Sequence, residues 1–376
     1  MSGPGQSNAD DSNPRLSRNN FDLLRAIFAT IVCLFHTASL SGYQSINWLE
    51  VNLSSSAAVR AFFVVSGFLI FMSYERATSV ASYASKRIRR IYPAYFTIVM
   101  VCAIFLVLAS SRSAAEYFSF SWLKYVAANL SFQNFLQPSL PGVFESNMYT
   151  AVNGALWTLK IEAMFYVTVP LLVFLCRKFS RLPILALVYV LSVTYAFGFQ
   201  RIAETTGSAM YAEIGRQFPG QLSYFIAGAF FYYFLSIFEK RLVFFLVGSL
   251  IILGINMIYP LPFFEPFAIA AVVGFFGLFG YLGNFGKYGD FSYGIYIVHF
   301  PIIQLLCQYG IFREQPWYFL VSAVILTGIS SVLMWHLVEK RFLLRSSHYI
   351  SASKPGSAVL PSFPNIADQK AEQDLS

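Results

Sequence analysis

The stretch "FDLLRAIFATIVCLFHTASL", residues 21–40, has the length and apolar content of a membrane-spanning helix, yet it contains Arg25 near its start and His36 well inside. A span needs about 20 mostly apolar residues, and ionisable side chains within one are costly. At about 1.5 Å and 100° per residue, the helix advances roughly 16 Å between these two residues and returns to within about 20° of its starting direction. Arg25 and His36 therefore lie on the same face of the helix. Arg25 lies near the membrane surface, and His36 lies beyond the middle of the membrane.

Apolar segments of this length recur along most of the chain, which is 57% hydrophobic and only 12% charged, well outside the range of soluble proteins. We predict an all-α integral membrane protein with about ten transmembrane helices. When the N-terminal end is placed inside, most of the 26 Lys and Arg residues fall in the inner connections, so both termini are expected in the cytoplasm. The predicted spans are 22–40, 55–74, 91–109, 154–176, 182–199, 219–238, 242–259, 264–282, 291–311 and 317–338.

The two ends of the chain are polar and differ from the segment between them. Residues 1–19 lack the apolar core and cleavage site of a signal peptide, and residues 346–376 cannot bury enough apolar surface to fold alone. We expect two disordered cytoplasmic tails around one membrane domain over 20–345. The long outer segment 110–150 is predicted to contain an interfacial helix. The lipid bilayer is the expected surroundings, with no nucleic-acid partner and no metal site.

A second polar position lies in "WTLKIEAMFY", inside the span 154–176. Counting from the outer end of that span places Glu162 at about the depth of His36, so a carboxylate and an imidazole are expected to meet there. Tyr166 lies on the Glu162 face, one turn further on. The competing interpretation is structural, with Arg25 and His36 satisfied by backbone carbonyls. Two polar residues on one face and a carboxylate at matching depth favour a functional site.

Three further positions have competing interpretations. The run "KRIRRIYP" is ordinarily an orientation signal or a contact for anionic headgroups, but Arg87 and Arg90 share a helix face and could clamp a phosphate. His299, in "SYGIYIVH", is either a site residue or a structural residue satisfied by neighbouring tyrosines such as Tyr293. Arg60 either reaches the outer interface or contacts a substrate.

These residues lie in a series of motifs that resembles the acyltransferase 3 family of bacterial membrane O-acyltransferases. The motifs follow the family order: "FDLLRAIFATIVCLFH", "VRAFFVVSGFLI", "KRIRRIYPAYF", "VNGALWTLKIEAMFY", "FIAGA", "SYGIYIVHFPI" and "LVEKRF". The resemblance covers about residues 20–345. Each motif is weak alone, whereas seven in order are specific.

The resemblance implies an inner-membrane enzyme that moves an acyl group, most often acetyl, from cytoplasmic acyl-CoA to a hydroxyl of a glycan or glycolipid. The glycans that the family modifies include lipopolysaccharide, exopolysaccharide and peptidoglycan. Acyl-CoA is then a co-substrate, and no tightly bound cofactor is expected. The resemblance, combined with the geometry above, predicts that His36 is the general base and that Glu162 stabilises the His36 imidazolium. The expected donor-binding residues are Arg25, Arg87 and Arg90, and possible substrate or oxyanion contacts are Trp157, Tyr166, Tyr293 and His299.

One position departs from the family pattern, because Arg60 stands where the family often has Asp. The C-terminal segment is also too short for the soluble hydrolase-like domain that some members append, so a stand-alone membrane member is expected. A secondary transporter or glycolipid flippase is the main alternative, although spans one to five show no obvious repeat in six to ten. A purely structural partner in a polysaccharide export complex is a third possibility.

Overall fold

The computed structural model describes residues 13–344, and every regular element in this range is helical. The predicted tails over 1–12 and 346–376 lie outside the described residues. The first half contains α1 (Phe21–Ser41), α2 (Asn47–Asn52), α3 (Ser55–Glu75), α4 (Val80–Phe105), α5 (Ala114–Tyr117), α6 (Phe120–Leu130) and α7 (Trp157–Phe179). The second half contains α8 (Arg181–Thr206), α9 (Ala209–Gly215), α10 (Phe218–Tyr233), α11 (Leu235–Lys240), α12 (Leu242–Asn256), α13 (Glu265–Leu278), α14 (Ser292–Gln308), α15 (Pro316–Met334), the π-helical η7 (Trp335–Glu339) and α16 (Lys340–Phe342).

Within residues 13–344, six helical segments are long and apolar enough to cross a membrane, and they contain α1, α3, α4, α7, α8 and α15. These segments coincide with six of the predicted spans, which confirms an all-α membrane protein. The other four predicted spans coincide with the shorter helices α10, α12, α13 and α14. Most residues of α10 and α14 are buried among other helices, so protein contacts surround them along much of their length. The count of ten spans and the side of the termini stay predictions.

The centre of the bundle depends on close contact between α3 and α10. A Cβ atom at Gly67 would collide with the carbonyl of Phe225, and one at Gly228 would collide with the carbonyl of Val64. Small residues that let helix backbones approach are characteristic of membrane helix interfaces, where packing replaces the hydrophobic driving force. The glycines of the motifs "VRAFFVVSGFLI" and "FIAGA" therefore allow these two helices to pack closely.

The start of α1 is fixed by contacts with the end of α13. The Asn20 side chain donates to the carbonyls of Phe276 and Gly280 and accepts from the backbone N–H of Leu282. Just before it, Arg15 pairs with Glu239 at 3.1 Å. Residues 13–19, the described end of the predicted N-terminal tail, thus pack against the helices, and Arg25 is held at a defined depth.

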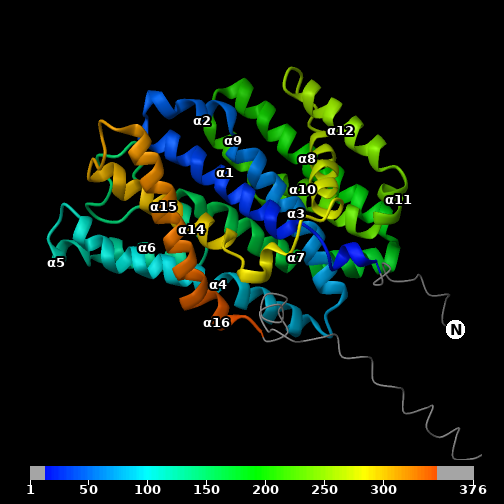
Figure 1. Ribbon diagram of the computed structural model, residues 1–376, viewed down its shortest axis with the longest axis horizontal. Coiled ribbons are helices and arrows are strands. Elements are labelled where there is room, and N and C mark those ends of the chain that lie inside the picture. The colour runs from blue at the N-terminus through cyan, green and yellow to red at the C-terminus, as the bar shows by residue number, and fades with distance from the viewer. Residues whose placement is uncertain (1–12, 345–376) are drawn as a thin grey trace, which may run out of the picture.

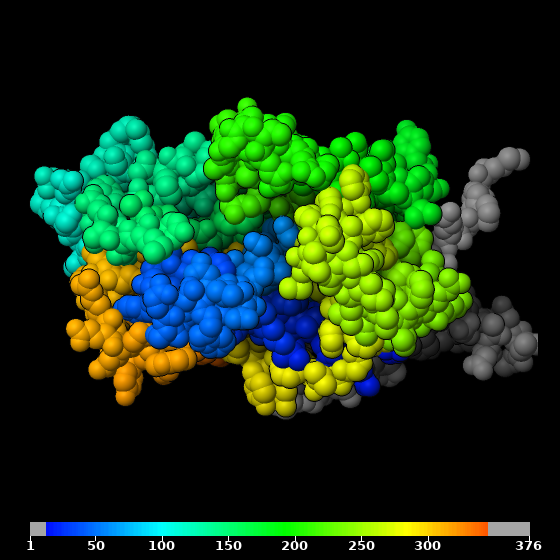
Figure 2. All heavy atoms as spheres, turned by 90° about the horizontal axis from the view of Figure 1, so that it is seen from above, coloured from blue at the N-terminus to red at the C-terminus, as the bar shows by residue number. Residues whose placement is uncertain are grey.

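Connections on the same predicted side of the membrane meet in the structure. At the predicted inner side, Arg177 in the last turn of α7 pairs with Glu75 at the end of α3 at 2.5 Å. At the predicted outer side, Lys160 donates to Gln217 at 2.6 Å. Figure 1 shows α1 and α3 crossing the middle of the molecule, with α5 and α6 at one end. Figure 2 looks onto the face that carries α2, in blue between the orange loop after α14 and the yellow-green end of α12.

The segment after α4, where an interfacial helix is predicted, contains the helix α6. This helix exposes Phe120 and Leu123 and buries Tyr125 and Asn129. Its irregular continuation is fastened to the outer half of α14, where Gln304 donates to two carbonyls of the segment at 2.6 and 2.8 Å. The segment therefore covers α14 from the outer side.

Candidate active site

The imidazoles of His36 on α1 and His299 on α14 form the polar pair at the outer half of the interior. His36 Nδ1 lies 2.9 Å from His299 Nε2, and the two rings are nearly parallel with centroids 5.1 Å apart. His299 is fully buried, whereas His36 is half-buried. The sequence placed His299 between a functional and a structural role, and the structure makes it the direct partner of His36.

The hydrogen bonds around this pair fix the tautomers of two neutral rings. His299 Nδ1 lies 3.1 Å from the carbonyl oxygen of Ile295, which only accepts, so His299 carries its proton on Nδ1. His299 Nε2 is then an acceptor, and His36 donates to it from Nδ1. The lone pair of His36 therefore lies on Nε2. A ring held in this tautomer is suited to take a proton from a bound hydroxyl.

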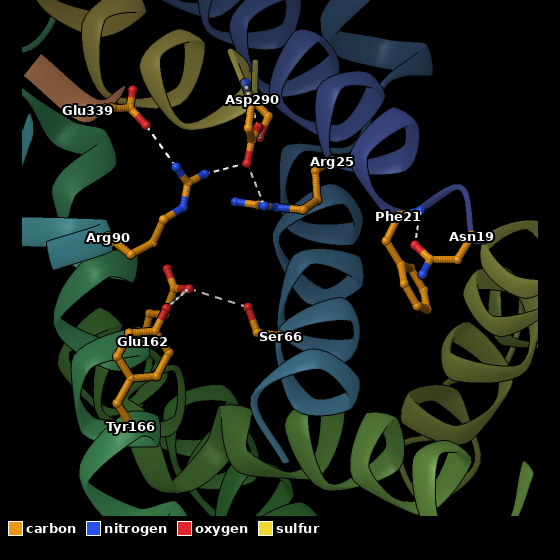
Figure 3. A network of polar contacts seen from close by, with 10 residues as sticks. Asn19, Phe21, Arg25, Ser66, Arg90, Glu162, Tyr166, Asp290 and Glu339 are labelled. Carbon is orange, nitrogen blue, oxygen red and sulfur yellow. Dashed lines mark hydrogen bonds and ion pairs between the residues drawn. The ribbon is translucent and has the colours of Figure 1, made fainter. Parts of the chain in front are cut away.

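Glu162 does not join the histidine pair. Its Oε1 accepts from the Tyr166 hydroxyl at 2.6 Å and from the Ser66 hydroxyl at 3.4 Å, and the described residues include no hydrogen bond or ion pair between Glu162 and His36. The expectation that this carboxylate meets His36 directly is therefore wrong. Instead, Glu162 faces Ser66 beside the arginine network (Figure 3).

The depth of α7 explains this difference. The 3-10 turn η5 (Gly154–Leu156) that precedes α7 is already inside the protein, where the ring of Phe300 packs against Gly154. The Asn153 side chain donates to the Ile297 carbonyl within α14. The start of α7 therefore lies below the predicted outer surface. The sequence-based depth of Glu162 was counted from that surface, so it is too shallow by the depth of this turn.

Two arginines and two carboxylates meet at the inner end of the same interior (Figure 3). Arg25 pairs with Asp290 Oδ2 at 2.6 Å, and Arg90 pairs with Asp290 and, at 3.0 Å, with Glu339. Burial alone would raise the pKa of Asp290, but Arg25, Arg90 and the hydrogen bonds from Ser292 outweigh it and lower the pKa to about 2. Asp290 therefore stays ionised and joins α1, α4 and the start of α14.

Asp290 and Glu339 are site residues that the sequence analysis missed. Asp290 lies in the connection between the predicted spans 264–282 and 291–311, and Glu339 lies in the family motif "LVEKRF". The available signal was indirect, because a buried arginine requires a carboxylate partner. Nothing in the local pattern identifies which carboxylate that is.

A cavity of about 480 Å³ adjoins this network and is lined by the predicted donor-binding residues. Arg25, Arg87 and Arg90 all face it, together with Arg76 and Lys86. Arg87 donates to Ser73 at 3.3 Å and lies over the Tyr166 ring, while its buried Nε has no hydrogen-bond partner among the described residues. Five cationic side chains around one cavity provide a site for a polyanion.

A second, narrower pocket adjoins the cationic cavity. Arg25 lines both spaces, so the two share a wall. The narrow pocket also contains Glu162, Ser66 and the hydroxyl-bearing residues Thr158, Tyr293 and Tyr296. The ring of Tyr296 in turn packs edge-on against that of His299, with centroids 6.0 Å apart. The narrow pocket therefore adjoins the cationic cavity at Arg25 and approaches the histidine pair at Tyr296, which contacts His299.

The remaining predicted contacts have defined partners. The hydroxyls of Tyr166 and Tyr293 donate to Glu162 and to the Ile91 carbonyl, respectively, so both donors are already engaged. Trp157 lies at the outer start of α7 beneath the guanidinium of Arg216. Arg60 pairs with Glu265 at 2.5 Å. Within residues 13–344, no group of three or more His, Cys, Asp or Glu is arranged to hold a metal ion.

The profile of the acyltransferase 3 family, described as an acyltransferase domain, matches residues 18–336. The chain belongs to this family. The site described above lies largely inside the matched region, including the histidine pair, the narrow pocket and three members of the inner network. Glu339 lies just beyond its end, as do Leu343 and Leu344 of the cationic cavity.

Two curated relatives cover most of the acyltransferase chain. It is 28% identical to the O-acetyl transferase of Shigella phage Sf6 over 89% of this chain and 98% of that protein. It is 26% identical to Nodulation protein 10 of Rhizobium leguminosarum bv. viciae over 86% of this chain and 92% of that protein. No solved structure matches the chain significantly. The family and the named relatives support O-acyltransferase activity in a membrane.

Proposed function

We propose that the protein transfers an acyl group, most simply acetyl, from cytoplasmic acyl-CoA to a hydroxyl of a cell-surface or lipid-linked glycan. The observation that carries this proposal is the pairing of two sites along α1. Its inner end places Arg25 at a cationic cavity, and its outer half places His36 against His299. The reaction requires a site that binds a nucleotide-containing donor and a base that takes a proton from an alcohol.

In the proposed reaction His36 acts as the general base. Nε2 of His36 takes the proton from the acceptor hydroxyl while the hydroxyl oxygen attacks the thioester carbonyl. The C–S bond then breaks, and the CoA thiolate leaves and recovers the proton from the imidazolium. His299 accepts from His36 Nδ1 throughout, which holds the ring in its reactive tautomer and stabilises the positive charge that forms on it.

The donor's phosphates are assigned to the cationic cavity. Arg87 lines this cavity together with Lys86 and Arg76, and its buried Nε has no hydrogen-bond partner among the described residues. Guanidinium groups bind phosphate oxygens through charge-assisted hydrogen bonds, which are about twice as strong as neutral ones. Arg25 and Arg90 contribute positive charge while Asp290 holds them in position. Acyl-CoA enters as a co-substrate, and no tightly bound cofactor takes part.

The acceptor is assigned to the outer side, above the histidine pair, in the bacterial inner membrane. The relative named as an O-acetyl transferase supports acetyl transfer to oxygen. The name does not specify the glycan, and the family's exopolysaccharide, lipopolysaccharide and peptidoglycan acceptors all present a hydroxyl of the required kind. The aromatic residues of the outer segment, including exposed Tyr149, provide surfaces on which sugar rings can stack.

The test uses the purified protein with acetyl-CoA and surface glycan isolated from a strain that lacks the gene. We expect free CoA to appear only when glycan is added, and the glycan to gain the mass of acetyl groups. The His36→Ala variant should release none. Transport of glycolipid across vesicles without CoA release would favour a flippase and overturn the proposal.

A further inference from the structure

Glu162 lacks the role that its position first suggested, because its carboxylate has no contact with His36. Both of its hydrogen bonds use Oε1, which leaves Oε2 without a partner among the described residues. The carboxylate lines the narrow pocket, which adjoins the cationic cavity at Arg25 and approaches the histidine pair at Tyr296. Glu162 Oε2 is therefore available to accept a hydrogen bond from a ligand that enters the pocket.

The chemistry of the pocket wall selects for a hydrogen-bond donor. Thr158 donates to the Ala155 carbonyl and accepts from Tyr296, and Tyr293 donates to Ile91. Ser66 donates to Glu162 itself. The hydroxyl protons around the pocket are thus already used, and the strongest free group is a carboxylate oxygen, which accepts. Arg25 also lines the pocket but is paired with Asp290, so the group that Glu162 Oε2 would bind is an uncharged N–H.

The distance between Arg25 and His36 matches the length of one part of the proposed donor. Arg25 and His36 are separated by roughly 16 Å along α1. In CoA, about twelve bonds link the phosphate oxygen to the sulfur. Because an extended peptide chain covers about 3.5 Å for every three bonds, this arm spans roughly 14 Å. An arm with its phosphate at the cationic cavity therefore brings its thioester to the histidine pair.

We propose that Glu162 binds the pantetheine arm of the donor by accepting an amide N–H through Oε2, while Tyr166 and Ser66 hold the carboxylate in place through Oε1. The assignment rests on the proposed use of acyl-CoA. The arm carries two amide N–H groups between phosphate and sulfur, and the narrow pocket adjoins the cationic cavity and approaches the histidine pair, the sites assigned to these two ends. Glu162 is then a residue that positions the donor and does not act on His36.

The test compares two ligands that differ only by this arm. CoA and adenosine 3′,5′-bisphosphate are titrated by calorimetry into the full-length protein in detergent, with no acceptor present. In Glu162→Met, which keeps the side-chain length but has no carboxylate, CoA should bind about tenfold more weakly and the bisphosphate should bind unchanged. Glu162→Gln retains an acceptor oxygen and should recover most of the CoA affinity. Arg87→Gln is the opposite control and should weaken both ligands.

Three results would overturn the assignment. Equal affinity of wild type and Glu162→Met for CoA would remove the contact with the arm. Loss of both ligands in Glu162→Met would place Glu162 in the phosphate site or in the fold. Normal CoA binding with a raised KM for the glycan would assign Glu162 to the acceptor. If the wild type binds neither ligand, the acyl-CoA proposal fails as a whole, which is a different outcome from any of these.

Discussion

Replacing His299 by Phe tests the roles that the hydrogen-bond chain assigns to the two histidines. Phe fills a similar volume in this fully buried position but has no acceptor for the Nδ1 proton of His36. A hydrogen bond to a charged group is worth about 1.5–3 kcal/mol, and His36 becomes charged in the proposed transition state. At 1.36 kcal/mol for each factor of ten, kcat should fall roughly 10- to 150-fold.

The assay is steady-state release of CoA from acetyl-CoA with saturating acceptor glycan. The KM for acetyl-CoA should stay within about twofold of the wild type, because the histidine pair lies away from the cationic cavity. His36→Ala should lose more, about 10²- to 10⁴-fold, the usual contribution of a general base. His336→Phe is the matched control, since His336 is exposed and lies beside the Phe291 ring at the inner end, and it should retain full turnover. Turnover of His299→Phe within threefold of the wild type would refute the orienting role, and a larger loss there than in His36→Ala would reverse the two roles.

The remaining predictions concern the inner network. Arg87→Gln with Arg90→Gln should mainly raise the KM for acetyl-CoA, and a raised acceptor KM would show instead that they do not bind the donor. Asp290→Asn leaves two largely buried guanidinium groups with one carboxylate, which should cost about 3–5 kcal/mol, or roughly 4–7 °C in the melting temperature in detergent. Glu204→Gln, which breaks an exposed pair, should change it by no more than about 2 °C. Because the folded pKa of Asp290 is lowered to about 2, its stabilising effect is present above pH 4 and lost as the pH falls from about 4 to 2, so the wild type and Asp290→Asn should converge there. A constant difference between them across that range would contradict the assigned ionisation.

The inner network also explains how one cavity holds so many cations. Arg25 and Arg90 share Asp290, and Arg90 has a second partner in Glu339. Buried ion pairs add little to stability by themselves, yet breaking one leaves an uncompensated charge. The carboxylates therefore fix where the arginines point, and Arg87 and Lys86 are left to supply charge for a ligand.

The sequence by itself determined the features that depend on local periodicity and composition. Apolar runs predicted the long helices, and the i, i+11 spacing placed Arg25 and His36 on one face of α1, because a helix repeats regardless of its neighbours. The basic run predicted the cations around the inner cavity, and the order of the motifs identified the family.

Only the tertiary structure decided which of these residues meet. His36 and His299 are separated by 263 positions, and their contact depends on how α1 packs against α14. Asp290 became the partner of two arginines for the same reason. Glu162 was placed wrongly because the turn before α7 is buried, and the sequence does not record the depth at which a helix starts. Distances along one helix follow from its own geometry, whereas distances between helices follow from packing that involves the whole chain.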